Sequence, residues 1–149
     1  MEEAKLNVKN LPISTKQSIE ICRFIRNMEL QKAKSTLNNV VNMKQAVPYI
    51  RHKMNIPHKA GIASGRYPVK ASFQILKLLE STEHNAIKEG MSKDLAIAHI
   101  SADKGVRQWH GGRQRRRKTK STNIKIILKE LKKDNTKPEN KNKTSKQEK

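Results

Sequence analysis

The sequence contains little of what small domains commonly use to hold themselves together. It has one cysteine, Cys22, in 149 residues, so neither an intramolecular disulfide nor a cysteine-based metal site can form. Aromatic residues make up 3% of the chain and hydrophobic residues 34%, which limits the core to a small one built mainly from aliphatic side chains and Met. These scarcities indicate a single domain with a modest core, in a reducing compartment.

Long apolar runs are also missing. No segment approaches the roughly 20 apolar residues that a membrane-spanning helix needs. The first five residues, MEEAK, begin acidic and lack the apolar centre of a secretion signal. We therefore expect a cytoplasmic protein.

The sequence offers no arrangement typical of catalysis. The five histidines lack the tight spacing of metal ligands. No phosphate-binding loop motif is present, because the segment from Gly105 to Gly111 lacks the Gly-Lys-Ser/Thr ending. Nothing resembles a nucleophile next to a base. We expect neither an enzyme nor a protein that holds a metal, a cofactor or a small-molecule substrate.

Acidic residues are scarce relative to basic ones, at 13 Asp and Glu against 33 Lys and Arg, for a net charge of +20. Such an excess repels itself in an isolated folded chain, which indicates that a polyanion supplies the opposite charge. Nucleic acid is the first candidate, because basic side chains that neutralise phosphates release condensed counterions. An anionic membrane surface is the second.

Three stretches have the apolar spacing of helices. The first begins at Ser14, where Ser14 and Gln17 fit a capping box, and is expected to end near Asn27. The second covers about 30–41, and the third about 68–88, with a proline as its first residue. The third helix is expected to have an apolar stripe of Val69, Phe73, Leu76 and Leu79, broadened by Ile75 and Leu78.

Other stretches alternate with the period of a strand or have no period at all. Residues 4–9 are expected to form a short edge strand. In residues 95–102, the even-numbered Ala and Ile alternate with the odd-numbered residues, and residues 124–129 alternate in the same way. These two stretches predict further strands. Residues 49–66 follow a helix-breaking proline and are expected to be irregular.

The strongest signal lies between these two strands, in residues 104–120, which we call the arm. The arm contains no acid, and its basic residues are Lys104, Arg107, Arg113, Arg115, Arg116, Arg117, Lys118 and Lys120. Guanidinium groups bind phosphates in pairs of hydrogen bonds and stack on bases, while Trp109 and His110 add planar surfaces for stacking. The arm is too long for a tight turn, so it is either a disordered loop or an extended continuation of the hairpin. A merely solvated loop is less favoured, because such loops usually mix charges.

A second basic patch lies at the start of the third helix, where Arg66 and Lys70 flank the helix terminus. Helix N-termini present unpaired amides to anions. The residues alone equally allow a plain start of a helix, with Tyr67 packed inward.

Several blocks of sequence resemble one known family. GRYPVKAS at 65–72, LKLLES at 76–81 and MKQAVPY at 43–49, together with Gly112-Arg113 and the later TNIKIIL at 122–128, resemble large-subunit ribosomal protein twenty-two (seventeen in eukaryotic naming) in its archaeal form. The resemblance covers about residues 4–131. The tip departs from the family pattern, since VRQWHG at 106–111 replaces its usual proline-containing run.

This resemblance implies an α+β fold with three helices packed on a small antiparallel sheet and a long extended β-hairpin. It implies one domain over residues 1–133, with the hairpin at about 95–131. The basic tail at 134–149 extends past the family's usual end, and because it has no apolar residues we expect it to be disordered when free. The expected partners are large-subunit rRNA, neighbouring ribosomal proteins and, near the hairpin tip, the nascent peptide in its exit tunnel.

The expected rRNA contacts follow from the arm, the second patch and a lysine near the first helix. Basic residues of the arm should meet phosphates, Trp109 and His110 should stack on bases or line the tunnel, and Arg66 and Lys70 should hold RNA against the body. The full set is Lys16, Arg66, Lys70, Lys104, Arg107, Trp109, His110, Arg113, Arg115, Arg116, Arg117, Lys118 and Lys120.

Two other kinds of protein would also account for the positive charge. An architectural DNA-binding protein would place the hairpin in a groove. A cationic membrane-surface protein would need helices with basic faces opposite bulky apolar ones, whereas here the densest charge lies in the arm.

Overall fold

One antiparallel sheet forms the framework of the body. The computed structural model describes residues 3–52 and 54–131, so the expected tail at 134–149 lies outside the described residues. Strands β1 (Glu3–Leu11), β6 (Thr122–Glu130) and β5 (Leu95–Lys104) pair in the order β1-β6-β5, all antiparallel. The edge strand expected at 4–9 is therefore confirmed, as are the two strands on either side of the arm.

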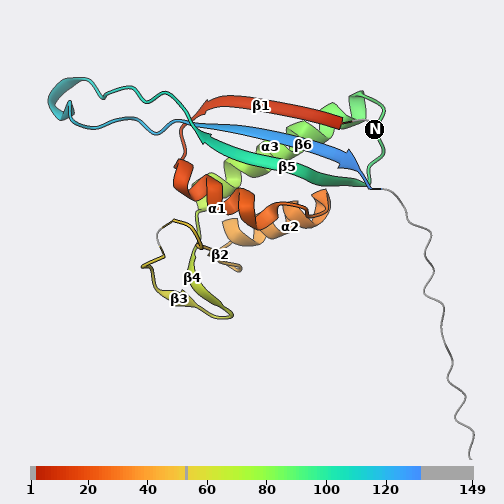
Figure 1. Cartoon of the computed structure of the whole chain (residues 1–149), viewed down its shortest axis with the longest axis horizontal. Coiled ribbons are helices and arrows are strands. Elements are labelled where there is room, and N and C mark those ends of the chain that lie inside the picture. Colours follow the sequence, from red (N-terminus) through yellow and green to blue (C-terminus); the bar gives the residue numbers. More distant parts are fainter. Residues whose placement is uncertain (1–2, 53, 132–149) are drawn as a thin grey trace, which may run out of the picture.

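Three helices cover one face of this sheet (Figure 1). They are α1 (Thr15–Ile25), α2 (Leu30–Val41) and α3 (Val69–Lys88). On β6 the residues Ile124, Ile126 and Leu128 are buried under the helices, while Lys125 between them is exposed. This alternation gives the sheet one apolar face, so the α+β class with helices on an antiparallel sheet is confirmed.

The start of α1 differs from the expected capping box. The helix does begin after Ser14, but among the described residues the Ser14 side chain caps no amide. Its carbonyl oxygen instead accepts a hydrogen bond of 3.0 Å from the Ser18 hydroxyl. The helix start was therefore predicted correctly, but the capping box was wrong, because the spacing of Ser14 and Gln17 permits the capping bonds without fixing the rotamers that make them. The helix also ends at Ile25, two residues earlier than expected.

A bulge in β5 changes which residues face the core. Ile97 lies opposite Leu128 and His99 lies opposite Ile127, so the residue between them is extra. As a result Ile97 is buried before the bulge and Ile100 after it. The uninterrupted alternation expected for 95–102 was therefore wrong at this point, because an inserted residue reverses the two faces of a strand.

Residues 47–66 form a second small sheet, whereas residues 49–66 were expected to be irregular. Strands β2 (Val47–Pro48), β4 (Ile62–Arg66) and β3 (His58–Lys59) pair in the order β2-β4-β3. We call this the small sheet; it lies beside α1, on the side of the body away from β1 (Figure 1). Strands of two residues carry too little periodicity to be recognised in a sequence.

The carboxylate of Glu20 connects α1 to the loop of the small sheet. Glu20 is 1% exposed. Its oxygens accept backbone N–H groups from Ile50 at 3.2 Å, Arg51 at 3.0 Å and His52 at 2.7 Å. A buried charge is tolerated when several donors surround it, so this carboxylate fixes the path of the loop.

The third helix is rotated slightly from the expected orientation. Ile75 and Leu79 are fully buried, and the small Ala71 and Ser72 also face inward. Phe73, expected in the apolar stripe, is 44% exposed instead, and its ring carries the Lys77 ammonium 4.6 Å from its centroid. Small residues near the start of α3 allow close packing, which leaves the adjacent Phe73 at the rim of the buried face.

The single cysteine belongs to the core. Cys22 is 1% exposed, and burial raises the pKa of its thiol to about 12. Only the thiolate reacts readily. We therefore expect a chromogenic disulfide reagent at pH 8 to modify native protein no faster than the protein unfolds, and to modify it at once in urea. Immediate reaction without denaturant would contradict this burial.

Candidate nucleic-acid interface

The arm leaves the end of the main sheet as an extended projection (Figure 1). Regular pairing ends at Lys104 and Thr122. Farther out the two sides still meet: the Thr119 N–H donates to the Gln108 carbonyl at 2.8 Å, and the His110 N–H donates to the Arg117 carbonyl at 2.8 Å. A short turn at Gly112–Gln114 closes the tip. Of the two possibilities left by the sequence, the extended hairpin is confirmed.

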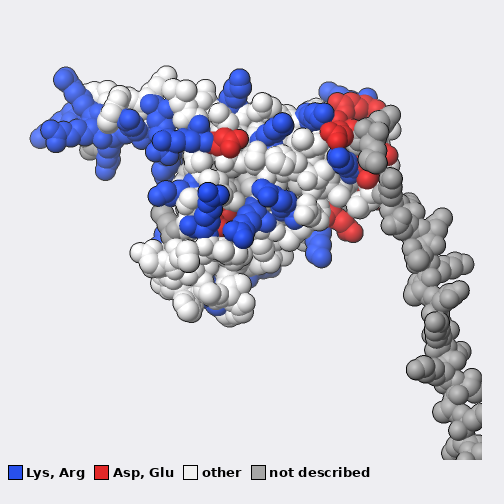
Figure 2. Space-filling model, in the orientation of Figure 1, with Lys and Arg blue, Asp and Glu red and all other residues white. Residues whose placement is uncertain are grey.

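The surface of the arm is almost purely cationic. Figure 2 shows blue side chains gathered over the projection and no red ones. All eight of its Lys and Arg side chains are exposed. Like charges crowded on so thin a projection repel one another, and no carboxylate within the arm offsets them. An external polyanion is the partner that this arrangement fits.

Apolar surface is exposed along the same projection. Trp109 is 60% exposed, and the Lys118 ammonium lies 4.2 Å from its ring centroid. Val106 is 82% exposed. Among these residues the indole carries the argument, because an exposed indole beside a cation suits stacking on a base. His110 next to Trp109 is exposed as well.

The root of the arm is fixed by a small polar network. Asn10, at the end of β1, has a left-handed backbone with φ of 60°. Its N–H donates to the Asn123 side-chain oxygen at 3.0 Å, and its own side-chain oxygen accepts the Ser121 hydroxyl at 3.1 Å. The Gly105 N–H donates to the Ser121 carbonyl at 3.1 Å. These contacts join β1 to both sides of the arm and therefore set its direction.

Gly105 leaves no room for a side chain. A Cβ there would lie 2.2 Å from the Ser121 hydroxyl oxygen and 3.1 Å from the Asn123 side-chain oxygen. We expect Gly105→Ala to cost about 1–3 kcal/mol of unfolding free energy and to speed hydrogen exchange at the Thr119 amide. Adding Ser121→Ala should recover part of that stability, since it removes the nearest atom. If the two substitutions changed the unfolding free energy additively, the Ser121 side chain would not be what excludes a larger residue at position 105.

The two basic residues of the second patch, Arg66 and Lys70, line two different hollows. Lys70, in the first turn of α3, and Lys120, at the arm root, line one hollow of about 160 Å³ beside the start of α1. Lys16 is exposed in the first turn of α1. Arg66 lies instead beside Tyr67 in a hollow of about 420 Å³ on the small sheet. The structure thus brings Lys70 and Lys120 together, whereas Arg66 belongs to a different part of the surface.

Sequence reasoning missed a further basic and aromatic cluster on the small sheet. Lys44, Lys59 and Phe24 line a pocket there together with Tyr67. These four residues come from four separate places in the chain between positions 24 and 67, and none belongs to a charge run. The one signal in the sequence is Lys59, because its position between Pro57 and Gly61 indicates an exposed turn.

Neither a metal site nor a membrane span is found in the part of the chain that the structure describes. Within residues 3–52 and 54–131, no three His, Cys, Asp or Glu side chains are placed to hold a metal ion. Over the same residues, no helix is long and apolar enough to cross a bilayer.

An α+β body with an exposed, acid-free arm defines a protein that binds a polyanion. Comparison with known proteins agrees with that class. Residues 6–129 match the family described as "Ribosomal protein L22p/L17e", and the chain therefore belongs to this family of ribosomal proteins.

Curated relatives match over most of their length. A Nanoarchaeum equitans protein named large ribosomal subunit protein uL22 is 44% identical over 138 residues, which cover 87% of this chain and 79% of the relative. The protein of the same name from Methanosphaera stadtmanae is 43% identical over 84% of this chain and 87% of its own. That from Methanoculleus marisnigri is 39% identical over 86% and 90%. The archaeal resemblance seen in the sequence is confirmed.

Proposed function

We propose that this chain is a structural constituent of the large ribosomal subunit, in the cytoplasm, and that it binds and organises large-subunit rRNA during assembly. Its role is structural rather than catalytic. Family membership and the names of the curated relatives support the assignment to the large subunit. The observation that carries the rRNA contact is the exposed, acid-free arm.

The roles of the arm side chains follow from their chemistry. The arginine and lysine side chains meet phosphates, since guanidinium groups match phosphate oxygens in pairs. Trp109 and His110 stack on bases or line the wall of the exit tunnel, where the nascent peptide passes. The arm is joined by few hydrogen bonds beyond Lys104, so its order in solution depends on the phosphates, and folding of the arm is coupled to RNA binding.

The body adds a second set of RNA contacts. Lys70 and Lys120 share a hollow at the arm root, which places them to hold one stretch of backbone, and Lys16 extends that surface along α1. Arg66 contacts RNA on the neighbouring small sheet. Faces that carry mixed charge are left for neighbouring ribosomal proteins.

Sucrose-gradient sedimentation of a tagged full chain tests this function. We expect the tagged protein to migrate with large subunits and to stay there in moderate salt. Migration with chromosomal DNA instead would favour an architectural DNA-binding protein, and migration with lipid vesicles would favour a membrane-surface protein. Either result would overturn the ribosomal assignment.

A further inference from the structure

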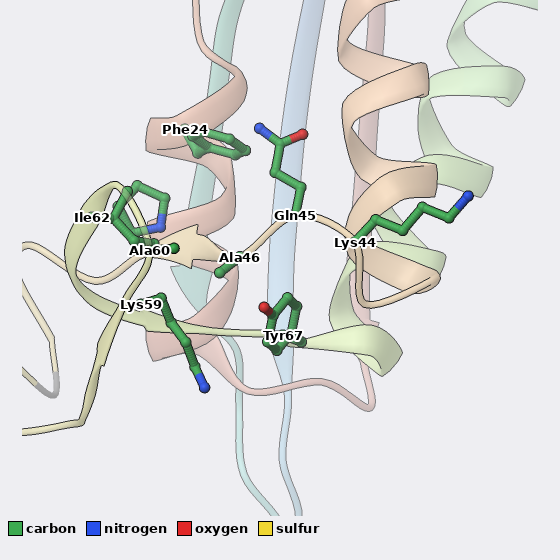
Figure 3. A pocket seen from close by; sticks show the side chains of 9 residues that line it. Phe24, Lys44, Gln45, Ala46, Lys59, Ala60, Ile62 and Tyr67 are labelled. Carbon is green, nitrogen blue, oxygen red and sulfur yellow. The ribbon is translucent and has the colours of Figure 1, made fainter.

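A pocket on the small sheet lies apart from the arm, and the RNA contacts proposed for the arm do not account for it. Its volume is about 300 Å³, within the range in which small-molecule sites begin. Phe24, from α1, and Tyr67, between β4 and α3, bound it on two sides (Figure 3). Ala46 also lines the pocket, and its small side chain leaves the space open.

The rest of the lining combines apolar walls with polar groups at the rim. Ala60 and Ile62 lie on one side, and the Gln45 side chain extends along the opposite side (Figure 3). Pro48 also lines the pocket. Lys44 and Lys59 complete the lining, which contains no acid. The Lys59 ammonium lies 5.7 Å from the Tyr67 ring centroid, so a positive charge stands at the mouth beside an aromatic face.

Gly65 helps to shape this wall. A Cβ on Gly65 would lie 2.5 Å from the Ile62 Cδ1 and 3.2 Å from the Lys59 Cγ. The bare glycine therefore lets both side chains lie across β4, where Ile62 forms the wall and Lys59 reaches the mouth. The position is buried, so a larger residue would displace these two side chains.

The pocket continues into a second hollow that suits a phosphate backbone. Lys59 and Tyr67 also line the hollow of about 420 Å³ that contains Arg66 and Met43. Arg66 is exposed there, and it lines the same hollow as Lys59. An aromatic slot opening onto two cations is the arrangement that unpaired nucleotides occupy, with the base stacked and the phosphate outside.

We propose that this pocket holds one unpaired nucleotide of RNA, with its base between Phe24 and Tyr67 and its phosphate at Lys59 and Arg66. The proposal rests on the function proposed above and adds a single-stranded contact on the small sheet. The side-chain amide of Gln45 is placed to bond the edge of the base. An RNA occupant is favoured by charge, because the lining contains two lysines and no acid.

The first test uses large subunits that contain the full chain. Irradiation at a wavelength absorbed by bases, followed by nuclease and trypsin, should give a nucleotide adduct on the peptide Tyr67–Lys70, and fragmentation of that peptide should place the adduct on Tyr67 and not on Lys70. Adducts on arm peptides without one on Tyr67 would overturn the pocket and leave the proposed function standing. Absence of adducts from both would contradict the proposed function itself. A neighbouring protein seated between the rings, in a reconstruction of the subunit, would also overturn the pocket.

The second test measures binding of a short, labelled single-stranded oligouridylate to the full chain. It uses a background in which the arm arginines are neutralised, so that the arm does not mask the pocket. Tyr67→Ala should weaken binding about 5- to 100-fold, while Tyr67→Phe should stay within about twofold, because stacking needs the ring and not the hydroxyl. Phe73→Ala, which removes an exposed aromatic outside the pocket, is the matched control. Equal affinity of Tyr67→Ala and Phe73→Ala would overturn the proposal.

Discussion

Neutralising the tip of the arm is expected to abolish stable incorporation of this protein into large subunits while leaving its body folded. The variant replaces Arg113, Arg115, Arg116 and Arg117 with Gln. These side chains are exposed and belong to no part of the core, so the unfolding temperature should not fall. For isolated rRNA, the slope of log affinity against log salt should become shallower by about 0.7 for each phosphate that the variant no longer neutralises.

A matched control removes the same charge from the body. Lys32, Lys77, Lys88 and Lys93 are exposed on α2, α3 and the loop before β5, and their replacement by Gln lowers the net charge equally. That control should sediment with large subunits at nearly the wild-type level. Normal incorporation of the arm variant, or an equal defect in the body control, would show that overall charge and not the arm drives binding.

Glu20→Ala is expected to destabilise the protein by about 2–4 kcal/mol, because it removes a buried charged acceptor that three part-buried backbone N–H groups share. The carboxylate is 1% exposed and accepts three successive N–H groups from the loop at 50–52. Urea denaturation measures the change in unfolding free energy. Hydrogen exchange should show these three amides becoming unprotected before the main sheet does.

The control for this prediction is Glu80→Ala on α3. Glu80 is exposed, and a surface substitution of that kind changes stability by less than about 0.5 kcal/mol. The unfolding free energy of Glu20→Gln should lie between those of the two Ala variants, since an amide oxygen can still accept one or two of the hydrogen bonds. If Glu20→Ala were as stable as Glu80→Ala, the loop would not depend on this carboxylate.

Much of the body could be predicted because its signals are local. The spacing of apolar residues in α2 and α3 is a helix pattern within one segment, and the alternation of Ile and Lys in β6 is a strand pattern within nine residues. The predictions failed where contacts between residues distant in sequence determined the structure. The spacing of Phe73 in the sequence places it in the apolar stripe of α3. In the structure, the small residues of α3 pack against the sheet and determine how the helix is rotated, so Phe73 is exposed.

The candidate site divides in the same way. The arm is a continuous run of basic residues, so it was visible in the sequence, whereas the pocket on the small sheet joins residues from 24 to 67 and has no local signature. Arg66 and Lys70 were expected to act together from their closeness in sequence. The structure separates them, because β4 ends and α3 begins between them, and the two sides of that junction face different hollows.

The sequence by itself determined the charge imbalance, its concentration in the arm, the main helices and strands, and the family. Those properties depend on residues that are close in sequence, so they do not require knowledge of how distant segments pack. Only the tertiary structure decided the bulge in β5, the carboxylate anchor at Glu20, the polar network at the arm root and the aromatic pocket. Each of these depends on residues far apart in the chain, whose approach is set by how the helices pack on the sheet.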